Sequence, residues 1–218
     1  MVEYIHDIGA VMTVTAVEQY TGGKYKIYLN DEFAFVLYKG ELRRLGIEPG
    51  SELSPEHIRE IVDGVILKRA KLRAMNLLKS RDYTERTLRR KLEEGLYPDE
   101  VIDEAVSWLK EYGYIDDYRY AASYIRNNKA TKSRKELRLK LIGKGVSSET
   151  VDHAFEEEGD NPKEEDKLIR RLLTKKLRGA DASGSAEKRR ILAYMYAKGF
   201  SVDKVERILD EVLLDITS

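Results

Sequence analysis

The sequence predicts a mainly α-helical protein in which three tandem three-helix repeats follow a small N-terminal three-stranded β-meander. Two observations support this fold class. Apolar residues alternate or run together within residues 10–38, as in strands, but from about residue 58 they recur at steps of three and four. The helical part also aligns with itself at shifts of 49 and 54 residues. Because one such unit buries little core, we expect the three to stack into an elongated, curved array.

The meander is predicted from three short segments and the turns between them. Residues 11–17 are rich in valine and threonine, and residues 24–29 and 33–37 alternate or run apolar. The pairs Gly22-Gly23 and Asn30-Asp31 favour tight turns at the two junctions. Three short strands bury little by themselves, so we expect the meander to pack on nearby helices.

A change to the helical pattern follows near residue 55. Ser54 is a preferred N-cap residue and Pro55 suits the first turn of a helix. We therefore divide the chain into a β-rich module and three helical repeats, with bounds 1–57, 58–117, 118–160 and 161–218. Deleting residues 1–57 is expected to leave a folded helical array.

Each repeat is expected to hold three helices that end near glycines. The expected ranges are 65–80, 84–94 and 98–112, then 118–129, 133–144 and 147–158, then 163–178, 186–198 and 201–214. The breaks fall at Gly95, Gly113, Gly145, Gly159 and Gly199. Capping-box patterns join Ser133 to Glu136, and Asn161 to Glu164 with Pro162 between them.

The repeats share residues as well as length. Between 85–106 and 134–155 the identities are Leu88/Leu137, Arg89/Arg138, Lys91/Lys140, Leu92/Leu141, Glu100/Glu149, Asp103/Asp152 and Ala105/Ala154. The third copy, 188–209, is weaker and matches at Lys144/Lys198, Gly145/Gly199, Ser147/Ser201 and Val151/Val205. The leucines hold helical apolar positions and are expected in the core.

Charge follows the repeat, although the formal net charge is zero. The first two helices of each unit are basic, because residues 68–91, 118–144 and 167–198 each carry +8. The third is acidic: residues 92–117 and 145–166 carry −8 and residues 199–218 carry −3. One interpretation is a set of solvated faces paired by neighbouring salt bridges. The other is a patterned field in which basic stripes face phosphates or acidic loops.

Several function classes lack support in the sequence. Cysteine is absent, and His6, His57 and His153 lie far apart, so no metal site or cofactor is expected. Asp116-Asp117 is expected to cap a helix starting near Tyr118, since no further carboxylate cluster supports catalysis. Trp108 is expected in the core. No apolar run approaches the roughly 18 residues of a membrane span, and no signal peptide is evident, which predicts a cytoplasmic protein.

Three stretches resemble the RecX family. Residues 77–92 carry a leucine pair, an arginine and a Thr-Glu cap before a Leu-x-x-Lys-Leu helix. Residues 113–121 read Gly-Tyr-Ile-Asp-Asp-Tyr-Arg-Tyr-Ala, similar to the best-known signature of that family. Residues 133–145 resemble its second-repeat version. The resemblance covers 65–158 well and 163–214 more loosely, and the meander resembles an N-terminal extension of some members.

The resemblance implies a non-enzymatic monomer that binds the RecA recombinase filament, and single-stranded DNA directly or through RecA. It implies a role in recombination, DNA repair and the SOS response, with inhibition of ATP hydrolysis and strand exchange favoured over stimulation. Filament-end capping and groove binding both stay open, as does the role of the β-module. The alternative is a duplex-DNA-binding regulator of helix-turn-helix type that acts without RecA. Net neutrality and the absence of a base-reading cluster argue against it.

The candidate partner or DNA contacts are outward basic residues on the first two helices of each repeat. They are Arg81, Arg86, Arg89, Arg90, Arg126, Lys129, Lys132, Arg134, Lys135, Arg138, Lys144, Arg189 and Arg190. The expected structural motif comprises Gly113, Tyr114, Ile115, Asp116, Asp117 and Arg119. Reversing Arg134, Lys135 and Arg138 to glutamate is expected to leave melting nearly unchanged and to weaken filament binding.

Overall fold

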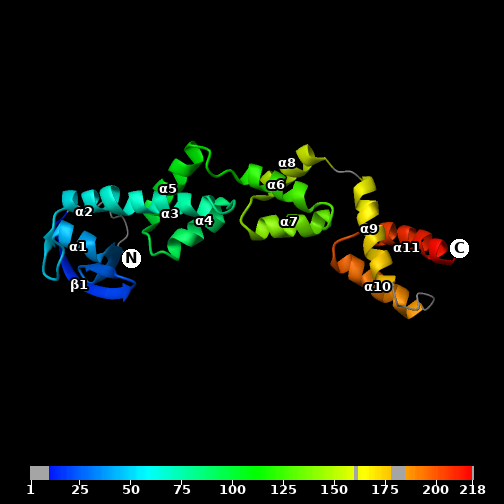
Figure 1. Ribbon diagram of the computed structural model, residues 1–218, viewed down its shortest axis with the longest axis horizontal. Helices are drawn as coiled ribbons and strands as arrows, with labels where there is room; N and C mark the ends of the chain where they lie inside the picture. Colours follow the sequence, from blue (N-terminus) through cyan, green and yellow to red (C-terminus); the bar gives the residue numbers. More distant parts are fainter. Residues whose placement is uncertain (1–9, 160–161, 178–184, 218) are drawn as a thin grey trace. The chain divides into compact units, whose positions relative to one another are not determined.

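The computed structural model describes residues 10–159, 162–177 and 185–217 (Figure 1). The chain divides into two compact units, Met1–Asp116 and Asp117–Ser218. The first unit contains the sheet and the first helical repeat, and the second unit contains the other two repeats. The predicted fold class, a small sheet followed by three-helix repeats, is confirmed.

The sheet is antiparallel and has the order β3-β2-β1-β4. Its strands are β1 (Met12–Thr21), β2 (Lys24–Leu29), β3 (Glu32–Tyr38) and β4 (Glu52–Leu53). The three predicted strands form the meander, and the short β4 adds a fourth strand that the sequence pattern does not predict. Gly22, Gly23, Asn30 and Asp31 all have positive φ, at 51°, 78°, 46° and 69°. Positive φ at both central residues is the pattern of the tight hairpin turns that these pairs predict.

A long helical stretch leads from the sheet into the first repeat. It comprises α2 (Pro55–Ile61), a π-helical turn η2 (Val62–Leu67) and α3 (Lys68–Leu78). The Ser54 hydroxyl caps it by accepting a hydrogen bond from the His57 amide at 3.3 Å, which confirms the predicted helix start. A further short helix, α1 (Lys39–Leu45), is not predicted by the sequence pattern.

The sheet and the first repeat share one hydrophobic core. Val14 and Phe35 of the sheet belong to the same cluster of buried side chains as Ile58, Leu88 and Leu109 of the helices. The expected boundary at residue 57 therefore runs through a continuous core. A fragment that starts at residue 58 would expose part of that core to water.

The remaining helices match the expected ranges closely. They are α4 (Glu85–Glu93), α5 (Asp99–Glu111), α6 (Asp117–Asn128), α7 (Arg134–Gly143), α8 (Ser148–Glu158), α9 (Pro162–Leu177), α10 (Ser185–Ala197) and α11 (Val202–Thr217). The second unit holds two hydrophobic clusters. One lies within α6–α8 and its connecting loops, and the other within α9–α11. None of the helices among the described residues has the length and apolar character to cross a bilayer.

Local chemistry sets the ends of these helices. Thr84 and Ser133, which are 49 residues apart, are both buried N-caps, and each accepts a hydrogen bond from the amide three residues on. The predicted cap at Asn161 lies outside the described residues. Helix α4 ends at Glu93, close to the break expected at Gly95, but the residue with a left-handed φ, of 59°, is Leu96 and not the glycine. A glycine at position 95 allows the Tyr97 ring to pack closely, since a Cβ there would lie only 2.9 Å from that ring.

Candidate partner-binding surface

Within each repeat, ion pairs between helices join the basic helices to the acidic third helix. In the first repeat Arg89 on α4 pairs with Asp103 on α5 at 2.5 Å. In the second, Arg138 on α7 pairs with Asp152 on α8, at positions 49 residues further along. Further pairs of this kind are Lys71–Glu104, Arg126–Glu158 and Lys188–Asp210. Part of the segregated charge therefore serves contacts within a repeat.

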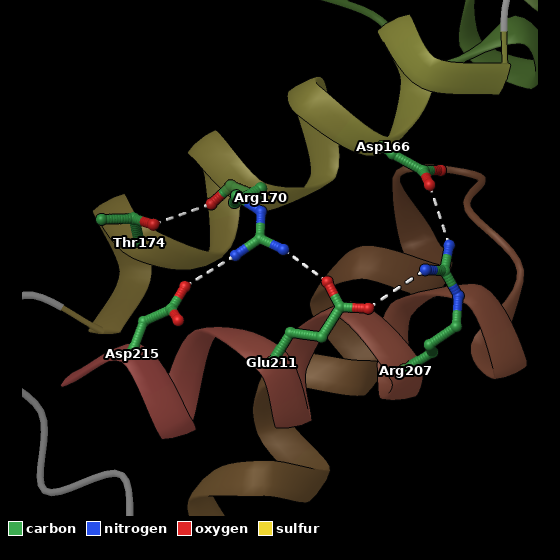
Figure 2. A network of polar contacts seen from close by, with 6 residues as sticks. All are labelled: Asp166, Arg170, Thr174, Arg207, Glu211 and Asp215. Atoms are coloured by element: carbon green, nitrogen blue, oxygen red, sulfur yellow. Dashed lines mark hydrogen bonds and ion pairs between the residues drawn. The ribbon is translucent and has the colours of Figure 1, made fainter. Parts of the chain in front are cut away.

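The third repeat extends this pairing into a network (Figure 2). Arg170 on α9 donates to both Glu211 and Asp215 of α11. Arg207 on α11 donates to Glu211 of its own helix at 3.1 Å and to Asp166 of α9 at 2.8 Å. The two helices are thus linked by cations from both sides.

These contacts also shift the ionisation of the acids. A hydrogen bond from Arg138 lowers the pKa of Asp152, and one from Arg126 lowers the pKa of Glu158. In the third repeat, a hydrogen bond from Arg207 lowers the pKa of Asp166. The acids are consequently held in their charged form, as the pairing requires.

Several of the predicted contact residues take part in ion pairs within their own repeat. Arg89, Arg126 and Arg138 pair between helices, while Arg90 pairs with Glu94 at 3.7 Å and Arg190 with Glu187 at 3.4 Å along their own helices. Arg138 is partly exposed but is not a free charge, because it pairs with Asp152 and donates to Ser148 at 2.5 Å.

Other candidates lie against aromatic rings or backbone oxygens. Arg81 lies over Tyr83, Arg134 over Phe155, Lys135 over Tyr196 and Lys144 over Tyr120, with cation-to-centroid distances of 4.7, 4.4, 5.6 and 5.9 Å. Lys129 donates to the Glu158 carbonyl at 3.0 Å, and Lys132 donates to the Asn128 side chain. In these six contacts the partner is a ring or a neutral oxygen, which does not neutralise the positive charge.

Three candidates occupy one equivalent position. Arg86 on α4 aligns with Lys135 on α7 at the shift of 49, and Lys135 aligns with Arg189 on α10 at the shift of 54. We call these three residues the second-helix cations. All three are exposed, and none takes part in an ion pair within the described part of the chain. Each repeat therefore presents an available positive charge at the same place on its second helix.

The signature at 113–121 forms the junction of α5 and α6. Gly113 has a φ of 68°, which suits the end of a helix, and Ile115 is 4% exposed in the core of the first unit. Tyr114 is 43% exposed and stacks on Trp108 with ring centroids 5.6 Å apart. Asp116 immediately precedes α6, which begins at Asp117 and carries the exposed Arg119.

The structure also reveals a basic cavity that the sequence does not predict. Lys24, Arg69, Arg73 and Lys91 line it, together with Glu94. Lys24 comes from β2, whereas the others come from the consecutive helices α3 and α4 and the residue after α4, which lie much further along the chain. No local spacing links them, so the sequence carries no signal for this site. Over the described ranges, no group of three or more His, Asp or Glu side chains could hold a metal ion.

Comparison with known proteins identifies related domains in each repeat. Family models described as the first, second and third three-helix domains of RecX match residues 70–109, 116–154 and 164–209, which together make up more than half of the chain. Each matched range begins and ends within the three helices of one repeat or directly beside them.

Relatives match over most of their length. Regulatory protein RecX of Caldanaerobacter subterraneus subsp. tengcongensis is 29% identical over 195 residues, covering 89% of this chain and 96% of the relative. Regulatory protein RecX of Leuconostoc mesenteroides subsp. mesenteroides is 30% identical over 203 residues, covering 90% of this chain and 74% of the relative. A crystal structure of regulatory protein RecX aligns with a TM-score of 0.62 at 26% identity and covers 91% of this chain and 99% of that one.

Proposed function

This chain belongs to the RecX family of regulatory proteins, and from that membership we propose that it binds the RecA–single-stranded-DNA filament. Bound there, it restrains the ATP hydrolysis and strand exchange of the recombinase. It acts as a cytoplasmic monomer without catalysis or a cofactor of its own. Its role is to occupy a surface of the filament.

The observation that carries this proposal is the threefold placement of the second-helix cations. A filament presents phosphates and acidic groups at regular intervals, so a partner with an available cation in each repeat can make equivalent contacts along it. Arg86, Lys135 and Arg189 are exposed and free of ion pairs among the described residues. Arg89 and Arg138 are less available to a partner, because they pair with Asp103 and Asp152 and hold the helices of a repeat together.

Measurement of DNA-stimulated ATP hydrolysis by RecA, with and without the purified protein, tests the proposal. We expect hydrolysis to fall as the protein is titrated against preformed filaments, and the effect to weaken as salt rises. Unchanged hydrolysis at saturating protein would contradict the proposal. Tight binding to a defined duplex site without RecA would instead favour a duplex-DNA-binding regulator.

A further inference from the structure

The basic cavity between the sheet and the first helical repeat has the features of an anion site. It measures about 370 Å³ and lies within the first unit. Four cations line it, Lys24, Arg69, Arg73 and Lys91, against one carboxylate from Glu94. A concave surface with an excess of one charge focuses its field and attracts the opposite charge.

Two of these cations are already committed to the fold. Arg69 donates to Glu41 at 2.7 Å and to the Val36 carbonyl at 2.6 Å, so it links α3 to the edge strand. Lys91 pairs with Glu94 at 2.6 Å. Both charges therefore have an internal role that a ligand need not disturb.

The other two cations are available to a ligand. Lys24 on β2 and Arg73 on α3 form no ion pair with any described residue, and Arg73 is exposed. They approach the cavity from the sheet and from the helix respectively. The site is thus assembled by the packing of the β-module on the first repeat, and neither part supplies it alone.

Aromatic rings distinguish this cavity from a simple basic surface. Tyr38 lines it, is 38% exposed, and has the Lys24 ammonium 5.7 Å and the Arg69 guanidinium 5.0 Å from its ring centroid. Tyr97 is 9% exposed, and burial raises the pKa of its hydroxyl, which stays protonated and able to donate. Cations beside an accessible ring are the combination that holds single-stranded nucleic acid, through phosphate contacts and base stacking.

We propose that this cavity binds the backbone of single-stranded nucleic acid, with Lys24 and Arg73 contacting a phosphate and Tyr38 packing against the adjoining base. An acidic peptide would use the cations but gains little from the ring, so the combination favours a nucleotide. The inference rests on the proposed function in that it gives the β-module a direct contact with the DNA on which the filament is built.

The test is direct binding of a fluorescent oligo(dT) of about twelve nucleotides, a length within the range of known single-stranded sites. Fluorescence anisotropy is measured without RecA on the full chain and on the double variant Lys24→Gln/Arg73→Gln. The matched control is Arg43→Gln/Arg44→Gln, which removes two exposed charges from α1 in the same unit. Thermal unfolding of all three proteins checks that each is folded.

We expect the cavity variant to bind about tenfold more weakly at low salt and the control to change less than about twofold. The salt dependence of the cavity variant should also decrease, by about 0.7 in logarithmic slope for each phosphate that it no longer neutralises. Equal reductions in affinity for both variants, or no oligo(dT) binding by the wild type, would overturn the proposal. Equally tight binding of a polyglutamate peptide, abolished in the cavity variant, would overturn it in favour of an acidic peptide.

The test of the cavity can fail or succeed independently of the test of the proposed function. Oligo(dT) binding needs no recombinase, and restraint of RecA hydrolysis needs no free DNA. If the wild type binds oligo(dT) through the cavity but leaves RecA hydrolysis unchanged, the proposed function fails and the cavity assignment stands. If hydrolysis is restrained equally by the wild type and the cavity variant, and both bind oligo(dT) equally, the cavity assignment fails alone.

Discussion

Arg89 on α4 and Asp103 on α5 face each other in an ion pair of 2.5 Å, and 49 residues further along Arg138 and Asp152 form the same pair. All four residues are among the few identities shared by the first two repeats. These shared residues thus make an equivalent contact between the second and third helices of both repeats. Charge segregation along the chain is in part a device for joining helices within a repeat.

The first prediction concerns this pair. A double-mutant cycle with Arg89→Gln and Asp103→Asn should yield a coupling free energy of about 0.2–1 kcal/mol, because both side chains are partly exposed to water. Chemical unfolding measures it, and filament binding of the Asp103→Asn variant should match the wild type. Additive effects of the two substitutions would show that the pair contributes nothing to the fold.

The second prediction concerns the contact between α7 and the end of α10. Gly199 has a φ of 92°, and a Cβ there would lie 2.7 Å from the Lys135 Cβ. Gly199→Ala should therefore destabilise the protein by more than the roughly 1 kcal/mol expected from positive φ alone. Gly113→Ala is the matched control, because Gly113 has a φ of 68° and open space around its Cβ position. Equal free energies of unfolding for the two variants would contradict the close approach.

The third prediction concerns truncation. The shared core of sheet and first repeat contains Ile58 and Ile66, in one cluster with Phe35. A fragment of residues 58–218 should therefore unfold its first repeat without cooperativity and aggregate, contrary to the expectation from the sequence pattern. A fragment of residues 117–218, which contains its own clusters, should unfold cooperatively. Circular dichroism and light scattering distinguish these outcomes, and a stable, monomeric 58–218 would show that the sheet is dispensable.

The fourth prediction concerns acid. The folded-state pKa values of Asp152, Glu158 and Asp166 lie below their ordinary values of 3.8, 4.5 and 3.8. The stabilisation of the folded state by these three ion-paired acids is therefore complete above their unfolded-state pKa values. It is lost as the pH falls through their folded-state pKa values. The melting temperature should hardly change between neutrality and about pH 5 and should fall below about pH 4. The melting temperature of the Asp152→Asn variant should fall less on acidification than that of the wild type. If the two melting temperatures depend on pH in the same way, Asp152 does not contribute to the acid sensitivity.

Much of this fold follows from local signals in the sequence. Ser54 and Ser133 cap helices as their chemistry predicts, and the Gly22-Gly23 turn lies between the expected strands. The helix α1 is hard to predict because it spans seven residues, contains Gly40 and has no buried side chain. Its start depends on the Glu41 carboxylate, which accepts a hydrogen bond from the Tyr38 amide at 2.7 Å.

The candidate surface is less predictable, because pairing between helices has no local signature. The repeat alignment marks Arg89 and Asp103 as shared residues but does not show that they face each other. Likewise, Lys24 and Arg73 are brought to one cavity by the packing of the sheet on α3. Equivalence between repeats is the useful signal, since it identifies Arg86, Lys135 and Arg189 as one position.

The central claim, that the second-helix cations bind the filament, is tested most directly by charge reversal. The triple variant Arg86→Glu/Lys135→Glu/Arg189→Glu should lose no more than about 0.5 kcal/mol of stability at each of the exposed Arg86 and Arg189. At Lys135 the loss should reach about 1 kcal/mol at most, because its ammonium lies over the Tyr196 ring. Its affinity for RecA filaments on labelled single-stranded DNA should fall about a hundredfold or more at low salt. The control Arg43→Glu/Arg44→Glu/Arg59→Glu changes the net charge equally and should bind much as the wild type does. If the triple variant is folded and binds the filament as tightly as the wild type, the second-helix cations do not form the filament-binding surface.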